Sequence, residues 1–191
     1  MNDNTDINML ALEALSADPV YLDTETTGLD EMAEMCEIAI LDSDGSPLLH
    51  TLVKPKNRIP WDAERIHGIS NEDVANAPTW PEIRDDVYKI LTARKLAIYN
   101  AEYDLRIIQQ CDQLYGLSPN HVQNWICVME LYAQYFGEWN ERRGNYKWQK
   151  LTTAAAHTKY IYTDRNAHRA DEDCRMTRHV LHFLSKTKLN F

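Results

Sequence analysis

The chain has 191 residues, of which 44% are hydrophobic and 26% charged, as in one folded domain with a substantial core. Its formal net charge of −9 argues against a protein that binds nucleic acid passively through a bulk positive field. No apolar run approaches the roughly 18 residues of a membrane span, and residues 1–18 contain no Lys or Arg, unlike a signal peptide. We therefore expect a cytoplasmic protein. Its cysteines are expected to be buried free thiols, although a disulfide stays open: Cys36, Cys111, Cys127 and Cys174.

The predicted elements begin with a short helix and three strands, and helices and strands then alternate before the final helices. Apolar residues recur at helical spacing near the start of the chain and predict an amphipathic helix: Ile7, Leu10, Ala11, Ala14 and Leu15. Residues 20–25 predict a buried strand that ends in a Thr-Thr-Gly turn. Further strands are expected at residues 35–42, 47–54, 95–99 and 122–128. Helices are expected to start at Ser70 and near residues 80 and 100, and to cover 129–136, 149–158 and 167–184. This order predicts a mixed sheet with helices on both faces.

Two acids interrupt the first predicted strand. Asp23 and Glu25 stand two residues apart, so their side chains point to the same face. Neighbouring carboxylates repel each other and are hard to desolvate, and Mg²⁺ removes both problems because it prefers carboxylate oxygens. The alternative is an acidic strand end that is exposed to solvent.

Two more acids and a histidine lie near the starts of helices. Asp104 belongs to the apolar stripe of the helix after the strand at 95–99, and Asp173 stands one residue before the inward Cys174. His168 lies at or just before the start of the last helix. Taken singly, these residues have ordinary explanations, as acids favoured by the helix dipole and as a surface histidine. Together with the two strand acids they indicate a metal site with an adjacent base.

These residues form a pattern that resembles the DEDD superfamily of exonucleases. Asp23-Thr24-Glu25-Thr26-Thr27-Gly28 resembles the first motif, Asn100-Ala101-Glu102-Tyr103-Asp104 the second, and His168-x-Ala170-x-x-Asp173 the third. The last motif is similar to the DEDDh branch, with its DnaQ-like proofreading subunits, exonuclease X, oligoribonuclease and RNase T. The DEDDy branch would have a tyrosine where Arg169 stands. The segment Arg65-Ile66-His67-Gly68-Ile69 also resembles the H-G-I segment that lines the family's terminal nucleotide pocket.

The resemblance implies an α/β, ribonuclease-H-like fold with a mixed five-stranded sheet flanked by helices on both faces. It implies an exonuclease domain over residues 20–185, with an N-terminal extension (1–19) and a C-terminal tail (186–191). The implied activity is divalent-metal-dependent 3′→5′ hydrolysis of mainly single-stranded DNA, with release of nucleoside 5′-monophosphates. Two Mg²⁺ or Mn²⁺ ions would be held by the four acids, with His168 as general base: Asp23, Glu25, Asp104 and Asp173.

The expected substrate-binding residues surround the catalytic strand: Thr24, Thr26, Gly28, Leu29, His67, Ile69, Asn100 and Tyr103. Backbone amides of the turn are placed to meet the chain end, and Leu29, His67 and Ile69 to pack on the end base. Ordinary loop packing explains the latter three equally well. Tyr99 departs from the family, in which many members have histidine, and we expect it to affect substrate packing more than metal binding.

The expected partner is a nucleic acid 3′ end, with single-stranded DNA favoured and RNA open. Residues 139–150 mix bases with aromatic residues, which suits either a strand-binding segment or a solvated loop. An exoribonuclease that trims RNA ends and a non-catalytic nucleic-acid-binding or polymerase-associated module are the alternative functions. A homodimer and a polymerase-type partner also stay open, and no membrane partner is expected.

Overall fold

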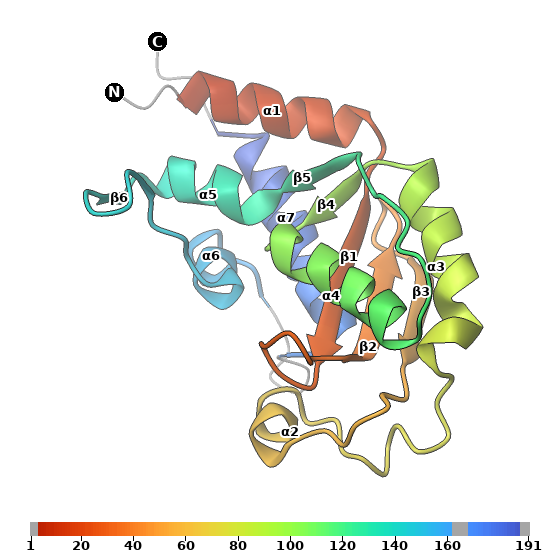
Figure 1. The fold of residues 1–191 in the computed structure, drawn as a ribbon. Helices are drawn as coiled ribbons and strands as arrows, with labels where there is room; N and C mark the ends of the chain where they lie inside the picture. Colours follow the sequence, from red (N-terminus) through yellow and green to blue (C-terminus); the bar gives the residue numbers. More distant parts are fainter. Residues whose placement is uncertain (1–3, 162–167, 188–191) are drawn as a thin grey trace.

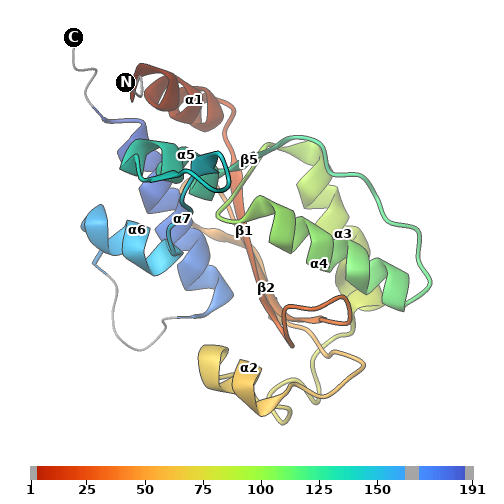
Figure 2. The same cartoon turned by 60° about the vertical axis from the view of Figure 1, so that its left-hand side comes forward.

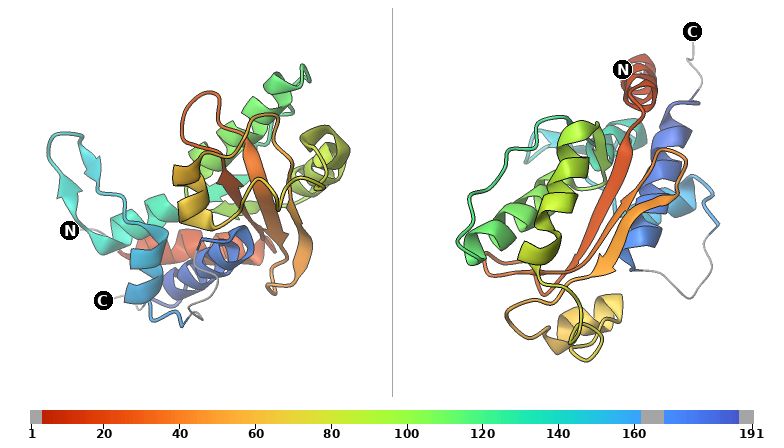
Figure 3. Two further views of the ribbon diagram at one scale, coloured as in Figure 1. Left: turned by 90° about the horizontal axis from the view of Figure 1, so that it is seen from below. Right: turned by 90° about the vertical axis from the view of Figure 1, so that its right-hand side faces the viewer.

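A five-stranded sheet lies at the centre of the computed structural model, which describes residues 4–161 and 168–187 (Figure 1). The two strands next to the central one run antiparallel and parallel to it, so the predicted mixed sheet is confirmed. In spatial order the strands are β3 (Pro47–Leu52), β2 (Met35–Leu41), β1 (Val20–Thr26), β4 (Leu96–Ile98) and β5 (Trp125–Cys127). A separate hairpin consists of β6 (Trp139–Asn140) and β7 (Asn145–Tyr146) and projects from the body of the molecule (Figure 3).

Helices cover both faces of the sheet, as predicted (Figure 2). One face carries α3 (Trp80–Ala93) and α4 (Ala101–Leu114). The other face carries α7 (Ala170–Leu184), against which α5 (Val128–Phe136) and α6 (Leu151–His157) pack. The first helix, α1 (Asn4–Ser16), lies against α5 and α7. The short α2 (Trp61–His67) lies beyond the end of β1, near the loop that follows this strand (Figure 1).

Burial explains why β1 and α7 hold a fixed relation to each other. Every residue of β2 is buried, and β1 is buried except for its partly accessible Asp23 and Glu25. The Cys174 thiol of α7 lies 3.4 Å from the Tyr21 carbonyl oxygen of β1 and 3.5 Å from the Ala39 carbonyl oxygen of β2. The first turns of α7 are therefore seated on the sheet beside the acids of β1.

A buried aspartate fixes α4 to α3. Asp112 accepts hydrogen bonds from Trp80 Nε1 at 2.8 Å, Arg84 Nε at 2.6 Å and the Tyr88 hydroxyl at 2.6 Å. All three donors come from α3, so one carboxylate satisfies three groups that would otherwise be desolvated at the interface. The amphipathic pattern of these helices did not reveal this contact.

Several predictions about elements need correction, and one helix was not predicted. Ser70 and Asp73 make the expected capping bonds, but the chain continues in turns and the next helix begins at Trp80. The helix α2 was not predicted; it ends where Gly68 adopts a φ of +72°, a conformation that favours glycine. In α1, Leu10 is 43% exposed, whereas Ile7, Ala11 and Ala14 are buried. The third and fifth strands are shorter than expected, and the last helix begins at Ala170, with residue 167 outside the described residues.

The cysteines behave as predicted. All four are buried and free, so the structure contains no disulfide among these described residues. In the described part of the chain, no helix has the length and apolar character needed to cross a bilayer.

Candidate active site

Three carboxylates from two elements converge at the end of the central strand. Asp23 and Glu25 share one face of β1, and Asp173 stands in the first turn of α7, which packs on that face. One oxygen from each of the three side chains lies within 4.8 Å of the others. The predicted pairing of the strand acids with the acid of the last helix is therefore present in the geometry.

The fourth predicted acid joins them in one hollow. Asp104 is buried in the first turn of α4, and its Oδ1 accepts a 2.8 Å hydrogen bond from the Thr24 hydroxyl. A hollow of about 200 Å³, hereafter the acid hollow, is lined by all four acids and His168, with five further residues: Thr24, Tyr99, Asn100, Tyr103 and Leu151. Helix α4 thus presents Asp104 to the acids held by β1 and α7.

Burial and mutual repulsion disturb the acidity of the whole cluster. Burial raises the pKa of Asp23 well above its ordinary value, and the charges of Asp173 and Asp104 raise it further. Burial likewise raises the pKa of Glu25 to about 9 and the pKa values of Asp104 and Asp173 to about 7. In the metal-free protein the cluster therefore holds protons more tightly than isolated carboxyl groups do, because the surrounding protein does not neutralise its negative charge.

The donor set fits divalent cations. Mg²⁺ and Mn²⁺ prefer carboxylate oxygens, and the acid hollow offers four carboxyl groups. In addition, Asp173 Oδ1 is buried and has no hydrogen-bond partner among the described residues. A buried carboxylate oxygen without a donor is costly unless a cation compensates it.

His168 enters the hollow from a strained backbone. Its φ is +66°, in the left-handed region that residues other than glycine adopt rarely. Such a conformation persists where the surrounding structure over-determines it, and it occurs often at functional sites. The imidazole is exposed and lines the acid hollow together with the four acids.

A buried ion pair, which sequence reasoning missed, holds the start of α7. Glu37 of β2 accepts hydrogen bonds from Arg169 Nε at 3.0 and 3.1 Å and from the Ala170 backbone N–H at 3.0 Å. His50 Nε2 lies 2.9 Å from the same carboxylate. Because Arg169 and Ala170 stand between His168 and Asp173, this contact fixes the segment that carries both. The available signal in the sequence was an acid inside the apolar run of residues 35–41.

A second hollow, hereafter the loop hollow, continues from the first past Thr24, Glu25 and Tyr103. It measures about 610 Å³, and six of the predicted substrate residues line it: Thr24, Thr26, Gly28, Leu29, His67 and Tyr103. The Tyr103 hydroxyl lies 2.8 Å from the Gly28 carbonyl oxygen and 2.6 Å from the Thr26 hydroxyl, which ties α4 to the turn after β1.

The other substrate predictions lie elsewhere. Ile69 is buried in a small apolar cluster with Cys36, Ile59, Ala63 and Val74 and does not line the loop hollow. Asn100 lines the acid hollow instead. At the rim of the loop hollow, Leu29 is 80% exposed, an unusual position for a large apolar side chain.

The acids at the end of the central strand and the mixed sheet between two layers of helices define a nuclease of the ribonuclease-H-like fold. A family model for exonucleases, named for RNase T, matches residues 20–181, and the chain belongs to this family. The resemblance to DEDD-type exonucleases and the predicted fold are thereby confirmed.

Relatives and solved structures agree with this assignment. The chain is 44% identical over 188 residues to an uncharacterised exonuclease, CP81, of Escherichia phage 186, and the match covers 96% of each protein. It is 36% identical to the epsilon subunit of DNA polymerase III of Rickettsia felis, over 47% of this chain and 42% of that protein, so it spans less than half of that relative.

Two solved structures show the same fold. Exonuclease X, solved in complex with 5′-overhanging duplex DNA, superposes with a TM-score of 0.64 and 25% identity, over 88% of this chain and 92% of that one. The nuclease domain of 3′hExo, a DEDDh family member bound to rAMP, gives a TM-score of 0.67 over 92% and 96% of the chains. At 16% identity, the second likeness concerns the fold alone.

Proposed function

We propose that the protein is a divalent-metal-dependent 3′→5′ exonuclease of the DEDDh type. It would act mainly on single-stranded DNA and release nucleoside 5′-monophosphates. The observation that supports this most directly is the acid hollow, in which Asp23, Glu25, Asp104 and Asp173 meet His168. The family match makes phosphodiester hydrolysis the reaction for which such a cluster is suited.

The four acids would hold two Mg²⁺ or Mn²⁺ ions. Bound there, the ions supply charge neutralisation at the phosphoryl oxygens, activation of water and stabilisation of the leaving oxygen. The raised pKa values of the acids and the unpartnered oxygen of Asp173 support this role.

His168 would act as the general base. It accepts a proton from the attacking water as the water oxygen bonds to phosphorus and the bond from phosphorus to the 3′ oxygen breaks. The cleaved residue leaves as a nucleoside 5′-monophosphate, and the released 3′ oxygen takes a proton from solvent, so that the shortened strand ends in a new 3′ hydroxyl. The ion pair of Glu37 with Arg169 keeps the backbone next to His168 in place throughout.

The 3′ polarity is supported by the loop hollow beside the acids. A terminal nucleoside in it would meet Thr26, Gly28, Tyr103 and His67, with the exposed Leu29 packing against the base. Burial lowers the pKa of His67, which favours a neutral ring suited to packing beside a base.

A labelled-oligomer assay tests the proposal. With Mg²⁺, a 5′-labelled single strand should shorten stepwise, whereas a 3′-labelled one should release labelled mononucleotide at once. EDTA should stop both reactions, and added Mg²⁺ or Mn²⁺ should restore them. Undiminished cleavage by an Asp23→Ala protein, or in excess chelator, would contradict the proposed site.

The same assay separates the alternatives. Matched DNA and RNA oligomers, each single- and double-stranded, distinguish a DNA exonuclease from an exoribonuclease. A module without catalytic activity would bind oligomers but leave them intact with either ion. For His168→Ala we expect a rate lower by about 10²–10⁴-fold with little change in binding, the usual contribution of a positioned base.

The proposed partner is a nucleic acid 3′ end, and the proposed location is the cytoplasm. The relative in Rickettsia felis is by name a polymerase subunit, and association of this chain with a polymerase or with a second copy stays a prediction. Molar mass from light scattering, with and without a DNA oligomer, tests the second copy directly.

A further inference from the structure

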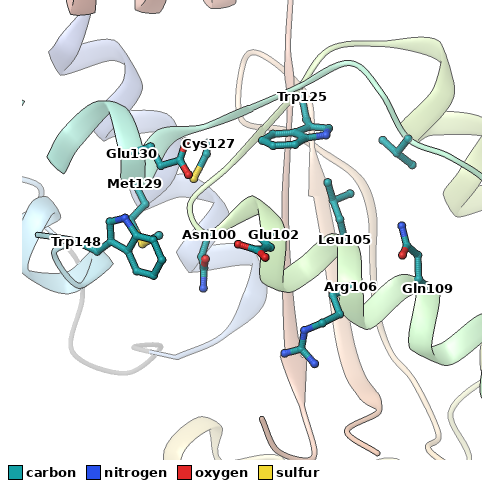
Figure 4. Close-up of a pocket in the computed structure, with 11 residues that line it drawn as sticks. Asn100, Glu102, Leu105, Arg106, Gln109, Trp125, Cys127, Met129, Glu130 and Trp148 are labelled. Carbon is teal, nitrogen blue, oxygen red and sulfur yellow. The ribbon is translucent and has the colours of Figure 1, made fainter. Parts of the chain in front are cut away.

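A third hollow lies on the other side of the acid hollow, between two exposed tryptophans (Figure 4). It measures about 460 Å³ and is hereafter the indole hollow. Trp125, at the start of the edge strand β5, is 42% exposed, and Trp148, in the segment before α6, is 52% exposed. Figure 4 shows their rings on either side of Asn100 and Glu102, at the start of α4. Two exposed indoles that line one hollow form an apolar surface of the kind that marks a binding site.

The indole hollow is continuous with the candidate active site. Asn100 lines both the acid hollow and the indole hollow. The Tyr99 hydroxyl, from the wall of the acid hollow, donates a 2.9 Å hydrogen bond to the Gln149 carbonyl oxygen. Tyr99, the residue that departs from the family pattern, thus holds the backbone next to Trp148.

The three hollows therefore follow one another around the start of α4. The loop hollow meets the acid hollow at Thr24, Glu25 and Tyr103, and the acid hollow meets the indole hollow at Asn100. A strand whose last nucleoside occupies the loop hollow and whose phosphate lies among the acids must leave on the opposite side. The indole hollow is the surface that it meets there.

The residues that line the indole hollow favour contact with nucleic acid bases over contact with phosphates. Glu102 and Glu130 outnumber Arg106 in the indole hollow, so phosphate oxygens are repelled. Apolar contacts come from the two indoles and from Leu105, Val122 and Met129. Indole rings stack on the faces of bases with little regard to sequence. Exposed Arg142, Arg143 and Lys150, on the hairpin and next to Trp148, lie outside the hollow and are available to the backbone of the strand.

We propose that the indole hollow is a stacking subsite for the bases of the single strand that lie 5′ of the scissile phosphate. This proposal rests on the proposed exonuclease function. Trp125 and Trp148 supply the stacking faces, and Tyr99 acts as a positioning residue for the segment of Trp148.

Substrates of different length test the subsite. Thymidine 5′-monophosphate p-nitrophenyl ester carries one nucleoside and a phosphodiester and cannot reach the indole hollow, whereas an oligothymidylate of eight residues can. For Trp125→Ala and Trp148→Ala we expect the KM for the oligomer to rise about 5- to 100-fold, the value of one lost stacking contact. The kcat for the oligomer and the hydrolysis of the ester should stay within about twofold.

Matched variants separate stacking from structure. Trp148→Phe keeps an aromatic face and should retain most of the affinity, whereas Trp148→Leu keeps apolar volume and should not. Trp61→Ala removes an exposed indole that lines none of the three hollows and should behave as the wild type. Tyr99→Phe removes the hydrogen bond to the Gln149 carbonyl oxygen and should raise the KM for the oligomer by a larger factor than it lowers the kcat for the oligomer.

The outcomes distinguish failure of the subsite from failure of the function. If the wild type hydrolyses both substrates and the tryptophan variants match it on the oligomer, the proposed stacking subsite is refuted. The indole hollow would then be a candidate surface for a protein partner instead. Equal losses on ester and oligomer would also overturn the subsite, because they indicate a structural effect. If the wild type hydrolyses neither substrate with Mg²⁺ or Mn²⁺, the proposed function fails, and oligomer affinity alone then decides whether the indoles bind bases.

Discussion

Four acidic residues meet at the end of β1, and each of them has a raised pKa. Each of these carboxyl groups has other carboxyl groups beside it and few hydrogen-bond donors that would stabilise its negative charge. Such a cluster lowers the stability of the metal-free protein, as is common at functional sites.

The Asp173→Asn variant should be more stable than the wild type without metal, although we expect it to be inactive. A raised pKa in the folded state means that folded protein binds protons more tightly than unfolded chain, so stability falls as pH rises from about 4 to 7. Removal of this acid should flatten that decline. At pH 8 in EDTA we expect a gain on the order of 1 kcal/mol, or about 2–4 °C in Tm.

Thermal melts in EDTA between pH 5 and pH 8 measure this effect. The exposed Asp86→Asn serves as the control and should leave both the melts and the activity unchanged. A variant of Asp173 that melts lower than the wild type at pH 8 would refute the repulsion argument.

Glu37 should contribute stability with the opposite pH dependence. Burial alone would raise the pKa of Glu37, but bonds from Arg169, the Ala170 N–H and His50 together lower it below its ordinary value. A lowered pKa gives stability that is present above the unfolded value near 4.5 and lost as pH falls through the folded one. Glu37→Gln should cost about 2–4 kcal/mol near pH 7, somewhat less than a fully buried pair because Arg169 is partly exposed.

Urea unfolding at pH 7 and pH 4 tests this contribution. The difference between wild type and Glu37→Gln should shrink toward pH 4, because the unfolded chain takes up a proton at Glu37 below its pKa near 4.5, whereas the folded carboxylate with its lowered pKa does so only at lower pH. Activity should fall further than stability explains, because the ion pair positions the backbone of His168 and Asp173. Parallel stability curves at both pH values would show that the ion pair does not titrate as described.

At the scale of elements, hydrophobic periodicity predicted those segments that bury a continuous face. The strands β1 and β2 and the helices α3, α4 and α7 follow their patterns closely, because the core selects their apolar residues. The site acids were predictable for the same reason: acids within apolar patterns stand out. Glu37 also interrupts an apolar strand, but its role was not predictable, because its partners Arg169 and Ala170 lie far away in the sequence.

Segments held by local or polar contacts were not predicted correctly. Ser70 and Asp73 satisfy each other in a turn, and the bonds of a capping box do not themselves require a helix to follow. The hairpin of β6 and β7 is held by the edge-to-face contact of Trp139 with Tyr146, at 5.0 Å between ring centroids, rather than by the main core. Such segments have no periodic pattern of apolar residues from which their structure could be predicted.

The contact between α3 and α4 offers a prediction at this scale. Asp112→Ala leaves Trp80, Arg84 and Tyr88 without their common acceptor in a buried place. We expect a loss of about 3–5 kcal/mol, the usual result when one partner of a buried charged network is removed. Asp86→Ala, on the exposed side of α3, should change stability by less than about 0.5 kcal/mol. Urea denaturation measures both, and equal losses would show that the network contributes nothing specific.

At the scale of the whole molecule, the apolar interior is divided in two. The main core lies between the sheet and the helices, whereas a small cluster under α2 contains Cys36, Ile59, Ala63, Ile69 and Val74. The small cluster supports one wall of the loop hollow through Ala63 and His67. Because it buries few apolar side chains, its local opening should require less free energy than global unfolding.

The buried cysteines report this difference without any introduced probe. Burial raises the pKa of the Cys36 thiol in the small cluster and that of Cys174 in the main core, so neither should react with a thiol reagent in the folded protein. As urea increases, we expect Cys36 to be alkylated at concentrations well below the global transition, and Cys174 only within it. Pulsed alkylation followed by mass spectrometry of peptides resolves the two sites, and circular dichroism locates the global transition. Simultaneous labelling of Cys36 and Cys174 would mean that the two clusters unfold as one unit, with the wall of the loop hollow as stable as the sheet itself.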